Sequence, residues 1–194
     1  METVLCVCLG IGLSAACGFR VFVPMLVMSI AALSGHLNLS PGFAWIGTYP
    51  ALITFSVATV LEIGGYFVPW LDHLLDTMAT PAAIVAGTVA TAAIVTNMSP
   101  MMKWTLAIIA GGGAAGIVQG ATVVARGIST GTTGGLGNPL FATIELGGSV
   151  FMSVMTILVP VFGVVLLAVG AFAFFRLFRR KLGRKPAGPP VPVG

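Results

Sequence analysis

The sequence predicts an all-α protein, a polytopic membrane helix bundle of about six transmembrane helices. Hydrophobic residues make up 57% of the 194 residues and charged residues only 7%, and the mean hydropathy is +1.07. This composition excludes an ordinary soluble domain. The apolar runs are long and continuous, whereas a membrane barrel needs alternating segments of about ten residues, so the pattern indicates helices.

The charge distribution divides the chain into one transmembrane domain, residues 1–178, and a tail, residues 179–194. Most of the Lys and Arg residues lie at or just before this tail, and its end is rich in Pro and Gly, so we expect it to be disordered. The positive-inside rule places the tail in the cytoplasm. Its basic cluster suits anionic lipid headgroups, and it does not indicate nucleic-acid binding.

The first apolar run, residues 3–33, contains Pro24, which predicts a kinked or broken helix. Arg20 stands near the middle of this run. An unpaired charge at that depth costs on the order of 2.5 kcal/mol or more. Residues 34–50 then contain turn-forming and aromatic residues, which predicts an interfacial loop.

The second predicted helix, residues 51–67, carries Glu62 deep within an apolar stretch. The segment that follows, residues 68–81, places Asp72 and Asp76 one turn apart. We expect this segment to form an amphipathic turn on the cytoplasmic side.

Two further helices are expected over residues 82–96 and 104–125, followed by a glycine-rich loop at 126–138. The final apolar run, residues 139–176, is too long for one span and is divided by Pro160. The count of six spans places both termini in the cytoplasm.

Small residues recur every four positions on three of the predicted helices, which gives each of them a narrow, smooth face. These faces are Gly10/Ser14/Gly18, Ala83/Gly87/Thr91 and Gly112/Gly116/Gly120. Such faces let two helices approach closely, either within one chain or between the two chains of a homodimer.

An internal repeat is suggested by two matches that occur in the same order. The matches align residues 14–24 with 113–123 and residues 58–65 with 142–148. They place Gln119 opposite Arg20, and Glu145 opposite Glu62. Repeats of three spans each, residues 1–97 and 103–178, would be inverted across the membrane, an architecture known from transporters.

Several longer motifs carry a resemblance to a known family. They are GFRVFVPML, PGFAWI, EIGGYFVPWLDHLLDTMATPAA and TGGLGNP followed by Glu145. The sequence resembles domain-of-unknown-function family 4126, a bacterial multi-pass membrane family. The resemblance implies a helical domain in the bacterial inner (cytoplasmic) membrane and no assigned activity. It also implies further charged residues beside Glu145 and after Glu62, where this chain has Leu146 and Gly64/Gly65.

Four residues are candidates for a polar pathway or binding site: Arg20, Glu62, Gln119 and Glu145. Ionisable side chains within a membrane usually face the bundle interior or a water-filled path. The alternative is a structural ion pair, or a hydrogen-bonded carboxylate that only fixes helix packing.

A weaker candidate is an anion or lipid-headgroup site in the glycine-rich loop. Its residues would be Arg126, Thr132, Thr133 and Asn138. Asn138 is predicted as the N-cap of a helix that begins with Pro139, and a helix N-terminus attracts anions. The alternative is a capped connector between two spans, and the spacing excludes a Walker loop.

The sequence indicates no cofactor, no metal site and no enzyme. Asp72, His73 and Asp76 are better explained as surface charges than as metal ligands, and no Ser or Cys lies in a catalytic motif with a His. The sequence therefore favours a small transporter or channel-like protein. The alternative is a non-transporting membrane scaffold or lipid-binding partner protein that interacts through its basic tail.

Overall fold

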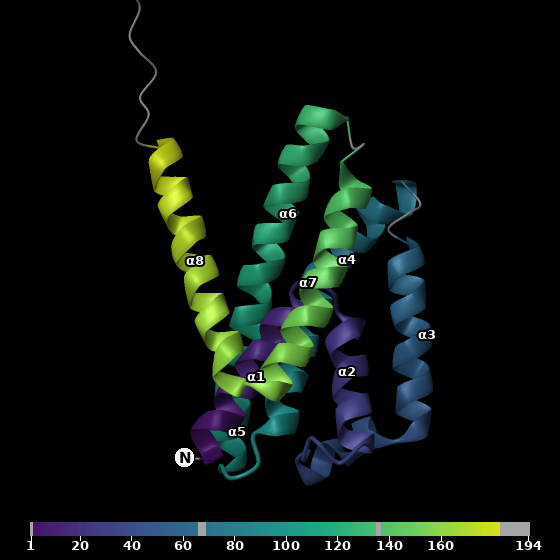
Figure 1. Ribbon diagram of the computed structural model, residues 1–194, viewed down its shortest axis with the longest axis vertical. Helices are drawn as coiled ribbons and strands as arrows, with labels where there is room; N and C mark the ends of the chain where they lie inside the picture. The colour runs from purple at the N-terminus through teal and green to yellow at the C-terminus, as the bar shows by residue number, and fades with distance from the viewer. Residues whose placement is uncertain (1, 66–68, 135–136, 183–194) are drawn as a thin grey trace, which may run out of the picture.

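The computed structural model describes residues 2–65, 69–134 and 137–182, and the described residues form helices without any strand. The helices, shown in Figure 1, are α1 (Glu2–Cys17), α2 (Phe22–Leu33), the 3-10 helix η1 (Pro41–Gly47), α3 (Tyr49–Gly65), α4 (Pro69–Ile94), α5 (Pro100–Leu106), the π-helix η2 (Ala107–Gly112), α6 (Gly113–Thr133), α7 (Asn138–Leu158) and α8 (Pro160–Leu182). The predicted all-α bundle is confirmed.

The first apolar run forms a hairpin of two short helices. α1 rises from one end of the bundle to its middle, and α2 returns toward the same end (Figure 1). The break lies at residues 18–21, so the prediction of a break at Pro24 was wrong by several residues. Pro24 lies in the first turn of α2, where its missing N–H is not needed. Each helix is shorter than the roughly 20 residues that cross a bilayer.

The segment 68–81, which we expected to be an interfacial turn, is part of α4. Pro69 is the first residue of that helix, a position that proline favours, and the helix continues through Pro81. The side chains of Asp72 and Asp76 lie outside the described residues, so their expected exposure is not tested.

Much of the predicted glycine-rich loop is also helical, because α6 continues to Thr133. Gly127 and Gly131 each cost roughly 1 kcal/mol in a helix relative to Ala, which weakens the helix without ending it. The helix ends at Gly134, whose φ of 63° is left-handed. The sequence placed Arg126 at the end of this helix, whereas the structure places it inside α6.

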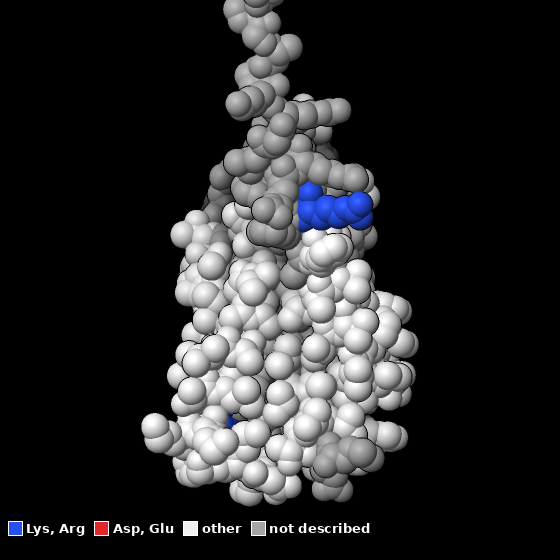
Figure 2. All heavy atoms as spheres, turned by 90° about the vertical axis from the view of Figure 1, so that its left-hand side faces the viewer, with Lys and Arg blue, Asp and Glu red and all other residues white. Residues whose placement is uncertain are grey.

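Three helical stretches in the described residues are long and apolar enough to cross a membrane: Thr77–Ile94, Pro100–Thr133 and Asn138–Leu158. A fourth crossing results if η1 and α3, which are bent by 64°, form one broken span. Figure 2 shows that one side of the bundle is almost free of charge, apart from a basic side chain toward one end and a small basic area near the other. These features define an integral membrane protein.

The N-terminal end of α1 and the C-terminal end of α8 lie at opposite ends of the bundle (Figure 1). This differs from the expectation that six spans bring both termini to the cytoplasmic side. The physical reason is the α1–α2 hairpin, which turns back in the middle of the bundle, so that its two helices begin and end toward the same end of the bundle.

The small-residue faces pack against one another within the chain. The Ser14 hydroxyl donates to the Gly87 carbonyl at 2.5 Å and lies 2.8 Å from the Thr91 hydroxyl. A Cβ built on Gly10 would lie 3.1 Å from Thr91 Cα, and one built on Gly18 would lie 2.6 Å from Val118 Cβ. The Gly10/Ser14/Gly18 face of α1 therefore packs against α6 and against the Ala83/Gly87/Thr91 face of α4, whereas Gly120 has open space around it.

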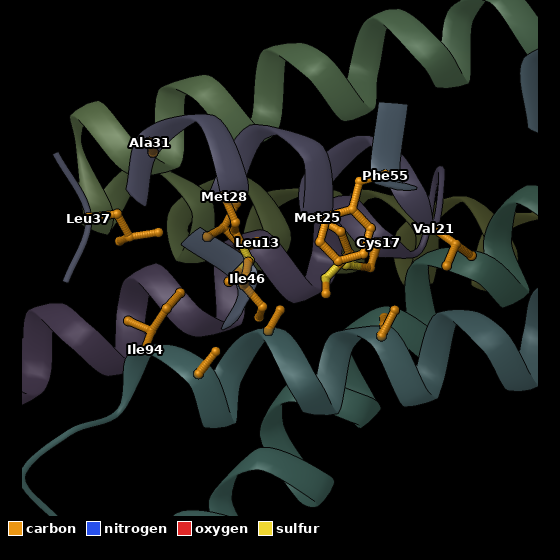
Figure 3. Packing of buried hydrophobic residues seen from close by; sticks show 14 of the residues in the cluster. Leu13, Cys17, Val21, Met25, Met28, Ala31, Leu37, Ile46, Phe55 and Ile94 are labelled. Carbon is orange, nitrogen blue, oxygen red and sulfur yellow. The ribbon is translucent and has the colours of Figure 1, made fainter. Parts of the chain in front are cut away.

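The apolar core lies mainly between α1, α2 and α4, with contributions from α3 and η1 (Figure 3). Phe55 of α3 reaches across to Met25 of α2, beside Cys17 at the end of α1. The core thus holds the α1–α2 junction in a fixed position inside the bundle.

The directions of the helices give mixed support to the inverted repeat. α3 and α7, which carry Glu62 and Glu145, run in opposite directions, as an inversion requires (Figure 1). α1 and α6, which were matched through Arg20 and Gln119, run in the same direction. The repeat therefore stays a prediction.

Candidate functional site

Four charged side chains are buried in the bundle and come from four different elements. They are Arg20 at the α1–α2 junction, Glu62 of α3, Arg126 of α6 and Glu145 of α7, and their exposed fractions are 2%, 9%, 4% and 4%. We call this group the ion cluster. Its two positive and two negative charges cancel formally, which makes burial in a membrane far less costly than for a lone charge.

Glu145 and Arg126 form the centre of the ion cluster. Arg126 Nε donates to Glu145 Oε1 at 2.9 Å, and Arg126 Nη2 donates to Glu145 Oε2. The two-point contact fixes both side chains in one geometry. It joins α6 to α7, which are consecutive helices that run in opposite directions.

Arg20 connects the α1–α2 junction to the same carboxylate. Its Nη2 donates to the Ala142 carbonyl at 2.9 Å and lies 3.8 Å from Glu145 Oε2. Glu145 is therefore shared by two guanidinium groups. The junction is tied to α7 a second time, because the Ser149 hydroxyl donates to the Ala16 carbonyl at the end of α1.

Glu62 caps the N-terminus of α2. Its Oε1 accepts the Val21 N–H at 2.8 Å, and its Oε2 accepts the Phe22 N–H at 3.2 Å. The side chain of Val21, the N-cap residue, makes no capping hydrogen bond itself. A carboxylate at this position satisfies N–H groups that lack partners within the helix, and it interacts favourably with the positive end of the helix dipole. Glu62 also interacts electrostatically with Arg20 and Glu145.

Gln119 lies on α6 and is 4% exposed. It precedes Arg126 by two helical turns, so both project from the same face of α6. Among the described residues, its side chain makes no hydrogen bond with the ion cluster. The structure thus brings three of the four predicted pathway residues together and places Gln119 on the same face but apart from them.

Two buried hydroxyls lie one turn from members of the ion cluster. Thr59 precedes Glu62 on α3, and Ser129 follows Arg126 on α6. Their oxygens are buried and make no hydrogen bond within the described residues. Such groups are uncommon in folded proteins and point to an interaction with water or a ligand. Neither residue stands out in the sequence, because Ser and Thr are also frequent in helix packing.

The residues of the weaker anion site do not converge. Arg126 faces Glu145, whereas the exposed Thr132 and Thr133 hydroxyls donate to the carbonyls of Ile128 and Ser129. The Asn138 amide contacts the Thr130 hydroxyl at 3.3 Å. Asn138 is the first residue of α7 and Gly137 is the cap, so the prediction of Asn138 as the N-cap was wrong.

No group of three or more His, Cys, Asp or Glu side chains suited to a metal ion occurs in the described part of the chain. The side chains of Asp72, His73 and Asp76 lie outside the described residues, so the interpretation of these three as surface charges is untested.

The fold and the site define a helical membrane protein with a buried, charge-balanced ion cluster beside a helix break. The family model described as Domain of unknown function (DUF4126) matches residues 7–180, and the chain belongs to this family. The resemblance noted from the sequence motifs is thereby confirmed. No curated protein and no solved structure matches the chain.

Proposed function

We propose that this protein is a small transporter or channel-like protein in which the ion cluster lines a polar pathway. The observation that carries the proposal is the α1–α2 hairpin, whose helix ends meet in the middle of the bundle beside the buried charges (Figure 1). Broken helices at this depth are the usual way in which transporters expose backbone polar groups to a substrate or ion.

The electrostatics of the junction support the proposal. Arg20 follows the C-terminal end of α1, where the helix dipole is negative, and Glu62 faces the N-terminal end of α2, where it is positive. Each helix end is thus matched by an opposite charge. A substrate that competes for either charge would loosen the junction, which links binding to movement of the hairpin.

The unpartnered Thr59 and Ser129 hydroxyls support a polar path next to the cluster. They come from α3 and α6, so polar groups line more than one helix.

The helix directions suggest a topology for the proposal. The basic residues from Arg176 onward favour the cytoplasm for the C-terminal end of α8, by the positive-inside rule. The membrane of the proposal is the bacterial inner membrane, as the family resemblance implies. The start of α1 then lies on the opposite side. α3, α4, α5–α6, α7 and α8 would cross the membrane, and the α1–α2 hairpin would re-enter it.

Flux measurements in proteoliposomes test the proposal. Proton flux is followed with a pH-sensitive dye, and efflux of potassium, chloride and phosphate is followed with ion-selective electrodes. We expect a flux above that of empty vesicles which falls at least tenfold in Glu62→Gln and in Glu145→Gln. Arg176→Gln is the matched control, because it also removes a charge but lies at an exposed position of α8 outside the cluster. Wild-type fluxes equal to those of empty vesicles, or unchanged fluxes in both Glu variants, would contradict the proposal.

A second candidate is a non-transporting scaffold or lipid-binding partner protein. It is favoured by the two-point contact between Arg126 and Glu145 and by the capping role of Glu62, since both are contacts that a structural cluster needs. Deletion of residues 179–194 separates the candidates. A scaffold would lose its preference for phosphatidylglycerol over phosphatidylcholine, or its association with its partner, and keep a folded bundle, whereas a transporter would keep its flux.

A further inference from the structure

An open apolar groove of about 550 Å³ lies between α2, α3 and α4 and is closed at one end by η1. It exists because α3 packs on α2 and η1 and touches α4 at only a few points. In Figure 1, α3 stands apart from the rest of the bundle along this side. The wall residues are apolar, and two of them, Met78 and Val85, are more than 60% exposed.

The groove runs from one end of the bundle toward its middle. Trp45 of η1 lies at the first end, and Val21 and Phe22 lie at the second, beside the start of α2. The wall formed by α4 extends from Met78 to Val89, a rise of about 17 Å at 1.5 Å per residue. This length is about half of a bilayer core of roughly 30 Å, which is the depth of one leaflet.

The η1 end of the groove also carries features of a membrane interface. Trp45 is 51% exposed, and tryptophan favours the headgroup region. Phe43 lies on η1, as Trp45 does, and Lys103 Nζ of α5 lies 5.4 Å from the centre of the Phe43 ring. The same Nζ donates to the Ser40 hydroxyl at 3.1 Å. A cation at this level complements the phosphate of a phospholipid.

We propose that the groove binds one acyl chain of a phospholipid from the leaflet at the η1 end, with the phosphate near Lys103 and the chain end near Val21 and Phe22. A helix from a second copy is a poor fit. At a diameter of about 10 Å, it would fill on the order of 1,300 Å³ over the same length. The groove is continuous with the apolar exterior of a membrane protein, where acyl chains are the surrounding solvent.

The site has a structural consequence for the ion cluster. The acyl chain would end against Val21 and Phe22, whose N–H groups are held by Glu62. The lipid would therefore contact the side chains of the first turn of α2, whose backbone Glu62 holds.

Photo-crosslinking tests the site and its direction. The full chain is reconstituted in vesicles of phosphatidylethanolamine and phosphatidylglycerol that contain a phospholipid with a diazirine either near the chain terminus or near the ester. We expect the terminal probe to label Val21, Phe22 and Met78, and the ester-proximal probe to label Trp45. The reverse order of labelling would overturn the proposal, as would labelling no stronger than that of Ile144, which is 60% exposed on α7.

Variants that fill the groove provide the second measurement. Ala82→Trp places a large side chain on the α4 wall, and Ile144→Trp is the control on an exposed face outside the groove. We expect labelling of Phe22 to fall about tenfold in the first variant and to stay unchanged in the second, with both proteins monodisperse. Unchanged labelling in Ala82→Trp would overturn the proposal. An interchain disulfide in Val85→Cys that is absent from Ile144→Cys would also overturn it, because a second copy would then occupy the groove.

Discussion

Glu62 Oε1 accepts the N–H of Val21 at 2.8 Å, so a carboxylate on α3 caps a helix whose N-cap residue lies 41 positions earlier in the chain. In most soluble helices the cap comes from a neighbouring Ser, Thr, Asp or Asn. Here the residue before α2 is apolar, and the start of the helix is buried in the middle of the bundle. The contact therefore joins the local stability of α2 to the packing of α3.

Replacing Glu62 separates the capping role from the role of its charge. We expect Glu62→Ala to lower the free energy of unfolding by about 1–3 kcal/mol, because two N–H groups lose their acceptor in a buried place. Glu62→Gln keeps one acceptor oxygen and should cost less. Unfolding in mixed micelles measures both. Thr143→Ala removes only a local bond to the Pro139 carbonyl and should change stability by no more than about 0.5 kcal/mol. Equal losses in Glu62→Ala and Thr143→Ala would argue against the cap.

The pair formed by Arg126 and Glu145 should show strong coupling. Removing one partner, as in Glu145→Leu, leaves a buried charge and should cost about 3–5 kcal/mol. The double variant Arg126→Met/Glu145→Leu should recover much of this loss, because neither charge remains. A double-mutant cycle on unfolding free energies measures the coupling. Additive losses in the double variant would show that the contact in the structure does not carry this energy.

The sequence predicted which charges lie inside the bundle but not what they contact. Arg20, Glu62 and Glu145 stand out in apolar runs, and the cost of a charge in lipid already requires an interior position. Their partners depend on tertiary packing. Arg20 reaches Ala142 across 122 positions, and Glu62 reaches Val21 across 41 positions, and no local pattern encodes either contact.

The helix break shows a second limit of sequence reasoning. Pro24 is the stronger local signal, yet the chain breaks before it, near Gly18, where α6 packs closely against α1. Proline is tolerated in the first turn of a helix, and α2 begins two residues before Pro24, so Pro24 does not interrupt it. The position of the break was decided by packing between helices that are far apart in the sequence.

Gly18 should be intolerant of even a methyl group. A Cβ at this position would lie 2.5 Å from the Ala115 carbonyl oxygen and 2.6 Å from Val118 Cβ. We expect Gly18→Ala to cost about 1–3 kcal/mol through overpacking. Gly147→Ala is the matched control, since nothing lies within 4 Å of its added Cβ and it sits within α7. That variant should be neutral or gain up to about 1 kcal/mol from helix propensity. A stable Gly18→Ala protein would mean that α1 and α6 are less closely packed than described.

Cys17 provides a natural reporter for opening of the α1–α2 junction. Its side chain is fully buried at the end of α1, three positions before Arg20, whereas Cys6 and Cys8 are partly exposed on the same helix. In the wild-type protein we expect a maleimide to label Cys6 and Cys8 and to react slowly with Cys17.

In Arg20→Gln the contacts with Ala142 and Glu145 are lost, so the junction is held less tightly to α7. If the substitution destabilises the closed junction relative to the open one by about 1.4 kcal/mol, the population of the open state rises tenfold. The Cys17 labelling rate should rise by the same factor, because labelling follows that population. Mass spectrometry of peptides resolves the three cysteines, and Arg176→Gln controls for the loss of a positive charge elsewhere, at an exposed position of α8. If Cys17 reacts at the same rate in Arg20→Gln and in Arg176→Gln, then Arg20 does not hold the junction closed, and the link between the ion cluster and the hairpin fails.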